Sequence, residues 1–351
     1  MLQAIFHAWE RRLASVTKDR VVRPFDWGLD WVAVAGDRDV PHQAAAPADH
    51  LSTWVSDVMT DTDAFYTPPP TRDYTLGPLE NGEQLLTFPS AITTPHAANN
   101  TVYGRLFHPK EHPSRRHRAA VVVLPQWNSD AGGHIGLAKL LAMSGMSALR
   151  LSLPYHDRRM PPELHRADYI VSANVARTLQ VCRQAVLDAR RAIAWLHAEG
   201  YDRIGILGSS LGSCLSLLTT AHEPLVRAQA LNHISPRFAD VVWRGISTAH
   251  VREGLDGHIE LDLLRELWSP LSPSNFIERV RDRKTLLVYA RYDLTFPVDL
   301  SRELVEQFSA MRVPYELAVL RCGHYTTGVS PFKFVDGWVL SRFLRRALLS
   351  D

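Results

Sequence analysis

Short apolar runs separated by polar segments recur along the chain after residue 83, and they predict buried strands. Four of these runs lie at 84–89, 101–107, 119–124 and 147–153. Between 171 and 199, apolar residues instead recur every three or four positions, which predicts a long amphipathic helix. A helix placed between two strands supplies the crossover that a parallel sheet requires. The pattern therefore predicts an α/β fold with a mostly parallel central sheet and helices on both faces.

The first part of the chain shows a different pattern. Its N-terminal segment carries one apolar helical stripe, formed by Leu2, Ile5, Phe6, Trp9 and Leu13. The stripe predicts a helix packed on the domain. Contact with a membrane surface is the alternative, because several Arg and Lys residues lie nearby. Residues 67–82 are rich in Pro and Gly and are expected to run extended over the surface. We therefore expect an N-terminal extension over 1–82 and a main domain over 83–351.

Composition and charge limit the classes of function. The 351 residues are 46% hydrophobic and 22% charged, with a formal net charge of +2, as in ordinary globular proteins. The basic segment 108–118 lacks interleaved aromatic residues and is expected to be a solvated hairpin tip, so no nucleic-acid partner is predicted. The sequence shows no secretory signal and no apolar stretch of membrane-spanning length. We therefore expect a cytoplasmic protein without an integral membrane segment.

The strongest functional signal is the segment RIGILGSSLGSCLSLL, which begins as an apolar strand and continues as a helix after a Gly-rich turn. Its G-x-S-x-G pattern centres on Ser210, with Gly208 and Gly212 on either side. A serine at so tight a corner needs neighbours that carry almost no side chain. Ser209 and Ser213 occupy places in the turn that do not suit a nucleophile. The pattern therefore predicts Ser210 as the nucleophile of acyl transfer.

A nucleophilic serine needs a base, and the base needs a carboxylate that orients it. Two downstream segments supply both in the expected chain order. The apolar run in 285–297 leads into a loop with Asp293, and the run in 315–328 leads into a loop with His324. Both residues follow a predicted strand, where open α/β sheets gather their chemistry. Asp240 is the alternative acid.

These residues and their order resemble the α/β-hydrolase superfamily over roughly residues 100–348. The resemblance implies that Ser210 is the nucleophile, that His324 acts as general base and then acid, and that Asp293 orients the imidazole. It also implies an oxyanion hole of two backbone N–H groups, one from Leu211 after the nucleophile. The second N–H is assigned to Trp127, with Gln126 as the other candidate. Gln126 departs from the glycine that is usual in the family at this place.

Two further segments are expected to shape specificity. Residues 154–166 follow a predicted strand and carry polar groups that are expected to contact the substrate. These residues are Tyr155, His156, Arg158 and Arg159. The alternative is a solvated loop with structural arginine pairs. Residues 235–283 stand where such hydrolases insert a helical lid, which would exclude water from the acyl pocket.

The N-terminal extension, the PYHDRRMP segment and the sequence before the serine together narrow the resemblance. They are similar to bacterial relatives of the "α/β-hydrolase domain-containing protein 18" family, with a looser likeness to dienelactone hydrolases and acetyl esterases. We predict a serine carboxylesterase that takes a small or medium acyl ester as its small-molecule partner, without a cofactor or a metal. A lipid deacylase, a thioesterase and a non-catalytic binding protein on the same fold are the alternatives. The oligomeric state is not specified by any of these patterns.

Overall fold

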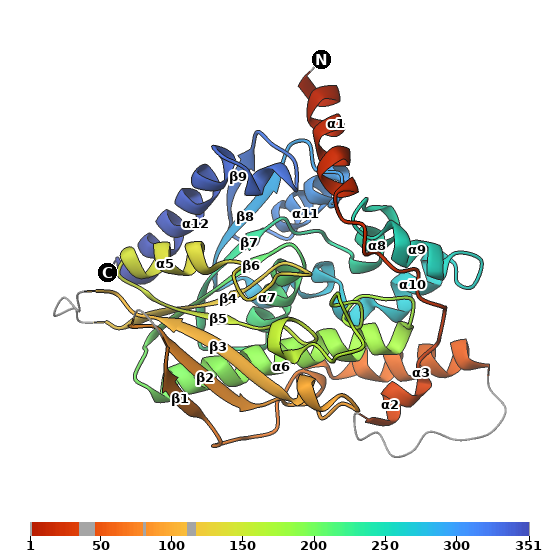
Figure 1. The fold of residues 1–351 in the computed structure, drawn as a ribbon, viewed down its shortest axis with the longest axis horizontal. Helices are drawn as coiled ribbons and strands as arrows, with labels where there is room; N and C mark the ends of the chain where they lie inside the picture. The colour runs from red at the N-terminus through yellow and green to blue at the C-terminus, as the bar shows by residue number, and fades with distance from the viewer. Residues whose placement is uncertain (1, 35–45, 80–81, 111–116, 351) are drawn as a thin grey trace.

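The structure is a computed structural model that describes residues 2–34, 46–79, 82–110 and 117–350. In these residues the fold is built on one nine-stranded sheet (Figure 1). The strands are β1 (Thr75–Pro78), β2 (Gln84–Pro89), β3 (Thr101–Phe107), β4 (Ala119–Leu124), β5 (Ser147–Leu151), β6 (Arg203–Ser209), β7 (Val226–Asn232), β8 (Lys284–Ala290) and β9 (Glu316–Leu320). Their order across the sheet is β1-β2-β3-β5-β4-β6-β7-β8-β9. The pairs β1·β2, β2·β3 and β3·β5 are antiparallel. All the other neighbouring pairs, from β5·β4 to β8·β9, are parallel. The predicted mostly parallel sheet is confirmed.

Strand β4 shows why an uninterrupted apolar run forms a central strand. Ala120, Val122 and Leu124 point into a core on one face of the sheet, and the alternate residues Val121 and Val123 point into a second core on the opposite face. Successive side chains of a strand lie on opposite faces, so a strand that is covered on both sides must be apolar throughout. The same reasoning accounts for the apolar runs of β5, β6, β7 and β8, which are also mostly buried.

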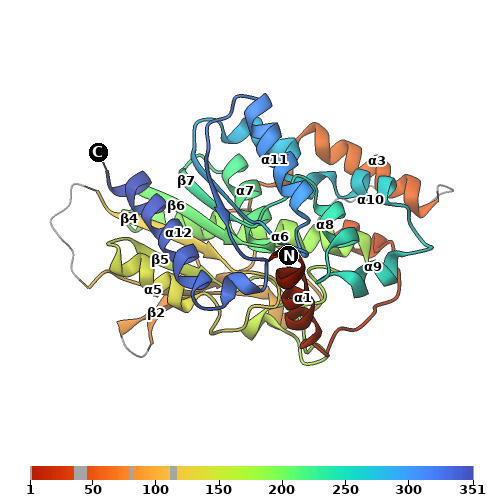
Figure 2. The same ribbon diagram turned by 90° about the horizontal axis from the view of Figure 1, so that it is seen from above.

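Helices cover both faces of the sheet, as predicted. On one face lie α5 (Ile135–Met143) and α12 (Phe332–Leu349), which share a core with the sheet. On the other lie α6 (Val175–Ala198), α7 (Leu211–His222) and α11 (Val298–Ala310), seen apart from α5 and α12 in Figure 2. The predicted helix over 171–199 is α6, which begins after Asn174 because the Asn174 side chain accepts a hydrogen bond from the Arg177 amide.

The N-terminal residues form α1 (Leu2–Ser15), α2 (Leu29–Val34), α3 (Pro47–Thr60) and α4 (Thr62–Phe65). Between β7 and β8 the chain forms α8 (Phe238–Arg244), α9 (Ala249–Leu255), α10 (Leu261–Leu267), η4 (Ser269–Leu271) and η5 (Pro273–Val280). This is the helical insertion expected over 235–283. Short helices elsewhere in the described residues are η2 (Ala97–Asn100), η3 (Asp157–Arg159) and η6 (Thr326–Gly328). None of the described helices is long and apolar enough to cross a membrane.

Two local predictions had different outcomes. The stretch expected to be extended over the surface does run so, and its residues Thr75–Pro78 form the exposed edge strand β1, whose pairing with β2 was not predicted. The segment 108–118 does not join neighbouring strands, because β5 lies between β3 and β4 and the segment is a connection rather than a hairpin tip. Its residues 111–116 lie outside the described residues. The hairpin prediction was wrong because sequence patterns locate strands but do not say which strands become neighbours.

The parallel strands place their carboxyl ends along one edge of the sheet. The loops that follow β4, β6, β7, β8 and β9 therefore converge at that edge, and each carries a polar residue of interest. The insertion after β7 and the segment that follows α1 reach the same edge, because residues of both line one cavity there.

Candidate active site

Ser210 stands at a strained corner between β6 and α7. Its backbone has φ 55° and ψ −119°, a conformation that residues with a side chain adopt rarely and at a cost of about 1–3 kcal/mol. The neighbouring glycines make the corner possible. A Cβ on Gly208 would lie 2.0 Å from the Gly212 carbonyl oxygen, and a Cβ on Gly212 would lie 2.1 Å from the Leu124 carbonyl oxygen. The G-x-S-x-G spacing is thus required by backbone contacts on both sides of the serine.

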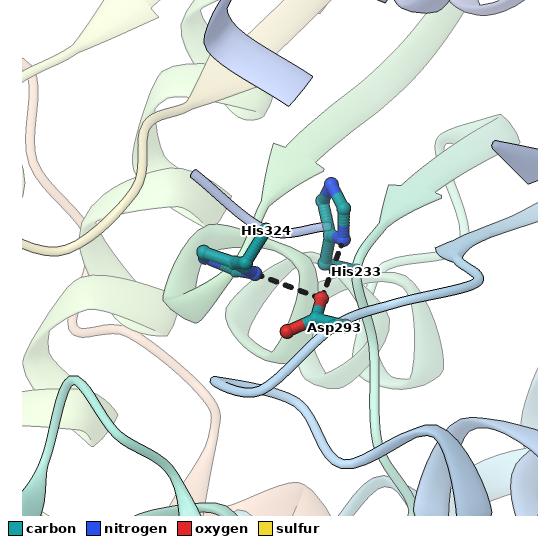
Figure 3. Close-up of side chains that lie close together, drawn as sticks. All are labelled: His233, Asp293 and His324. Atoms are coloured by element: carbon teal, nitrogen blue, oxygen red, sulfur yellow. Dashed lines mark hydrogen bonds and ion pairs between the residues drawn. The ribbon is translucent and has the colours of Figure 1, made fainter. Parts of the chain in front are cut away.

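Asp293 and His324 are joined by a hydrogen bond at the ends of β8 and β9 (Figure 3). The Nδ1 atom of His324 lies 3.0 Å from Oδ2 of Asp293. Since an ionised carboxylate only accepts, Nδ1 donates and a neutral ring keeps Nε2 free to accept a proton. The other carboxylate oxygen, Oδ1, accepts from the backbone amides of Thr295 at 2.8 Å and Phe296 at 2.7 Å. These bonds fix the orientation of Asp293.

The charges of this pair depend on each other. Burial acts to raise the pKa of Asp293, but the charge of His324 and hydrogen bonds from His233 and His324 outweigh it and hold the pKa far below its usual range. Burial acts to lower the pKa of His324, but the charge and hydrogen bond of Asp293 outweigh it and raise the pKa. The arrangement therefore favours an ionised Asp293 and strengthens His324 as a base.

A second histidine shares the same carboxylate oxygen, and the sequence analysis did not single it out. His233 follows β7, and its Nδ1 lies 3.0 Å from Oδ2 of Asp293 (Figure 3). Its ring centroid is 4.7 Å from that of His324. The available signal was a histidine at the end of an apolar run. This histidine could be assigned to the site only once the strand order was known, because that order places β7 between β6 and β8.

Among the described residues, His233, Asp293 and His324 form a group whose potential metal-ligand atoms lie within 4.8 Å of one another. The two hydrogen bonds to Asp293 Oδ2 account for this proximity. The arrangement is therefore explained by hydrogen bonding between two donors and one acceptor, which does not require an ion.

Ser210, His324 and the three oxyanion candidates line a single cavity of about 370 Å³. The candidates are Leu211, Trp127 and Gln126, and within the described part of the chain none of their backbone amides donates a hydrogen bond. No hydrogen bond joins the Ser210 hydroxyl to His324 among the described contacts, and such bonds are often loose before a substrate binds. The cavity thus gathers a serine, an imidazole and free backbone donors.

The loop after β4 is held in place by His156. The Nδ1 atom of His156 donates to the Pro154 carbonyl at 2.8 Å, which leaves Nε2 to accept from the Asn128 amide at 2.9 Å. Complete burial lowers the pKa of His156 to about 4, so the ring stays neutral and keeps this acceptor. The Trp127 indole N–H also donates to the Ala167 carbonyl at 2.9 Å. These bonds position the oxyanion candidates.

The residues expected to contact the substrate are placed elsewhere. Tyr155, His156 and Arg159 are fully buried, and neither they nor Arg158 line the cavity beside Ser210. Arg159 lies 2.9 Å from Asp188 in a buried ion pair, which is the structural alternative considered for this segment. Tyr155 is hydrogen-bonded through its hydroxyl to a histidine ring, and Arg158 lines a separate cavity. The chain turns inward after β5, so its polar groups support the core and the β4 loop.

The other residues considered for the site are also accounted for. Asp240 accepts hydrogen bonds from Arg237 at 3.0 Å and from Arg265 at 2.7 and 2.9 Å. These bonds occupy both of its carboxylate oxygens. Ser213 donates to the backbone carbonyls of Ser210 at 2.6 Å and His233 at 2.8 Å. Ser209 is the last residue of β6. The structure therefore brings Asp293, and not Asp240, to His324.

The insertion and the segment after α1 complete the cavity. Phe238, Val241 and Val242 of α8 supply an apolar wall. The described lining also holds three arginines, Arg20, Arg166 and Arg237, and no acidic side chain. Arg237 is paired with Asp240 and with Glu303, and Arg166 with Asp19. Arg20 donates to the Ile246 carbonyl and the Tyr325 hydroxyl, so no described carboxylate neutralises it.

Comparison with solved structures identifies the fold. Acetyl xylan esterase from Paenibacillus sp. matches with a TM-score of 0.58 and 16% identity, covering 96% of this chain and 99% of that one. Acetyl xylan esterase 1 from Thermoanaerobacterium sp. matches with 0.58 and 14%, covering 91% and 99%. Acylaminoacyl peptidase from Pyrococcus horikoshii matches with 0.58 and 14%, covering 80% of this chain but only 43% of the peptidase. No family model and no curated protein matches the sequence.

The chain therefore has the α/β-hydrolase fold, as the resemblance implied. At these identities the likeness concerns the fold alone, and function has to be argued from the site. The narrower likeness to the "α/β-hydrolase domain-containing protein 18" family has no match in these comparisons and stays a prediction.

Proposed function

We propose that the protein is a serine hydrolase, a carboxylesterase that cleaves small or medium acyl esters through an acyl-enzyme intermediate. The observation that supports it best is the combination of a strained serine and a carboxylate-bound histidine on one cavity. Ser210 has a positive φ, and His324 is bound through Nδ1 to the buried Asp293. A strained backbone and a buried carboxylate both cost folding free energy, and both are found at the active sites of enzymes with a serine nucleophile.

The reaction follows from these contacts. His324 Nε2 takes the proton of the Ser210 hydroxyl while Oγ attacks the ester carbonyl and forms a tetrahedral intermediate. The amides of Leu211 and Trp127, or Gln126 in place of Trp127, donate to the negative oxygen. His324 then gives its proton to the leaving alcohol oxygen as the C–O bond breaks. Water, deprotonated by the same Nε2, hydrolyses the acyl-enzyme and regenerates Ser210.

Asp293 acts through His324 in this scheme. Its hydrogen bond keeps the proton of the neutral imidazole on Nδ1, and its charge stabilises the imidazolium that forms when Ser210 loses its proton. His233 donates to the same oxygen and holds Asp293 from the other side. His156 contributes by fixing the loop that carries the oxyanion donors.

The cavity suits an acyl group of limited size and has one lining cation without a described carboxylate partner, Arg20. Its apolar wall from α8 suits a hydrocarbon chain, and a volume of about 370 Å³ suits a small or medium ester. Of the three lining arginines, Arg20 alone has no described carboxylate partner, and its charge favours neutral or anionic esters over cationic ones.

Hydrolysis of p-nitrophenyl esters from acetate to palmitate tests the proposal. The wild type is compared with Ser210→Ala and with Ser213→Ala, which removes a buried hydroxyl three residues away. We expect turnover on short and medium chains that is abolished by Ser210→Ala and mostly retained by Ser213→Ala. Turnover that persists in Ser210→Ala would contradict the proposal.

A lipid deacylase is the second candidate, favoured by the exposed apolar side chains of α1. Leu2 and Ile5 expose 64% and 56% of their surface. Such side chains, with basic residues nearby, suit peripheral contact with a membrane. An optimum at long acyl chains, with turnover that rises when vesicles are added, would favour the deacylase over the small-ester enzyme. Turnover of acyl thioesters in preference to esters would favour a thioesterase. The absence of any turnover would favour a non-catalytic binding protein.

A further inference from the structure

Helix α1 carries a fully buried carboxylate that the proposed mechanism does not use. Glu10 has an exposed fraction of 0%, and Ala14 is the other buried residue of this helix. Figure 1 shows α1 projecting from the body of the molecule. The only charged side chain among the buried residues of this helix is thus Glu10. Burial of a carboxylate is unfavourable unless its oxygens are hydrogen-bonded, so the partners of Glu10 are informative.

Both oxygens of Glu10 bind the loop that carries His324. Oε2 accepts from the Tyr325 amide at 2.9 Å, and Oε1 accepts from the Thr326 amide at 2.9 Å. On the other side of His324, a Cβ on Gly323 would lie 2.4 Å from Cδ of Glu10. The loop is therefore shaped around the Glu10 side chain both before and after the histidine.

The same helix also contacts the loop of Asp293. The Phe6 ring stacks on Tyr292, with centroids 4.6 Å apart and planes 12° from parallel. Tyr292 directly precedes Asp293, and its amide donates to the Cys322 carbonyl at 3.0 Å, which joins the two loops. Helix α1 thus bridges the segments that carry the acid and the base.

We infer that Glu10 is a positioning residue for the proposed hydrolysis and that α1 is a required part of the active site. The inference rests on the proposed function, because it assigns Glu10 to the base of that reaction. By holding the two amides after His324, Glu10 fixes the backbone from which the imidazole reaches Asp293 and Ser210. Charge-assisted bonds from a carboxylate to backbone amides suit this task, because they are directional and strong.

The charge of Glu10 gives a readout that packing alone would not move. The titratable groups that face His324 are Asp293 after β8, His233 after β7 and Glu10 on α1, with Tyr325 next in the chain. Burial acts to lower the pKa of His324, and the charges of Asp293 and Glu10 are among the causes that raise it. His324 must be neutral to accept the proton of Ser210, so its pKa sets the acid limb of kcat/KM. Loss of the Glu10 charge moves that limb to lower pH.

The test compares Glu10→Gln and Glu10→Ala with the wild type and with Glu306→Gln. The control removes an exposed carboxylate on α11 that has no described partner. The kcat and KM for p-nitrophenyl butyrate are measured as a function of pH, and thermal unfolding reports on the fold. We expect Glu10→Ala to lower kcat on the order of 100-fold with KM changed by less than about threefold, as for other losses of catalytic geometry. Glu10→Gln should lower kcat less and shift the acid limb to lower pH, and Glu306→Gln should do neither.

Glu10 variants that unfold at lower temperature but keep the kcat and acid limb of the wild type would overturn the inference and leave a purely structural role. A wild type that hydrolyses no ester and reacts with no fluorophosphonate would instead refute the proposed function, and this inference with it. If neither Glu10 variant folds, Phe6→Ala is the decisive variant, since it removes the ring stacked on Tyr292. It should lower kcat without raising KM, and an unchanged kcat would overturn the role of α1.

Discussion

Replacing Asp293 by Asn tests the acid assignment most sharply, because the structure fixes how the amide must orient. Oδ1 of Asp293 accepts from the Thr295 and Phe296 amides at 2.8 and 2.7 Å. The Asn oxygen has to take this place, since an NH₂ group there would face two donors. Its NH₂ group then replaces Oδ2 and points at His324.

An NH₂ group at that position reverses the histidine tautomer. His324 Nδ1 must accept instead of donate, so the proton of the neutral ring moves to Nε2, where it blocks acceptance of the Ser210 proton. In serine proteases the same change costs about 10⁴-fold in kcat, or about 5–6 kcal/mol of barrier. We expect a loss of that order here. His233 donates to the same oxygen and faces the same conflict, so thermal stability should also fall.

The assay measures kcat on p-nitrophenyl butyrate for Asp293→Asn and for the matched control Asp240→Asn. Asp240 is equally buried and accepts from Arg237 and Arg265, so its replacement should lower stability while kcat stays within about tenfold of the wild type. A kcat near the wild-type value in Asp293→Asn would exclude Asp293 as the residue that orients His324. A large loss in Asp240→Asn alone would move the acid role to Asp240.

Four further outcomes are expected. Gly212→Ala should lower the unfolding temperature and kcat together, because its Cβ would lie 2.1 Å from the Leu124 carbonyl oxygen, and a variant that melts like the wild type would contradict this. The kcat/KM should fall as pH drops below the raised pKa of His324, since only the neutral ring accepts a proton, and a flat acid limb in stopped assays would exclude His324 as the base. His156→Phe should lower kcat by about 10–100-fold with little change in KM, because the Asn128 amide loses its acceptor and the oxyanion loop shifts. An ester with a trimethylammonium group should have a lower kcat/KM than its neutral isostere because of the Arg20 charge, and equal values would show that this charge does not select between substrates.

Much of the fold could be predicted because the signals were local. The strands over 84–89, 101–107 and 119–124 match the structure residue for residue. The third is a fully buried apolar run, and the first two are partly buried runs rich in apolar residues. The signal for the turn at Ser210 was equally local, because the glycines that the turn needs lie two residues before and two residues after the serine. Asp293 and His324 were found by their place after predicted strands.

The remaining features depend on contacts between distant segments. His233 joins Asp293 only because β7 and β8 are neighbours, and Glu10 meets His324 across more than 300 residues of chain. Tyr155, His156 and Arg159 were predicted to face the substrate, but the turn after β5 buries them. Their residue types suit both roles, and only the path of the backbone decides between them. Sequence patterns carry no information on that path.

The most direct test of the central claim is to locate the covalent adduct of a fluorophosphonate probe in the native protein. After reaction, intact mass spectrometry counts the adducts and peptide mapping assigns them. We expect a single phosphonylated residue, Ser210, and loss of ester hydrolysis in proportion to labelling. Ester hydrolysis that continues after complete labelling, or an adduct at another serine with Ser210 unmodified, would contradict it.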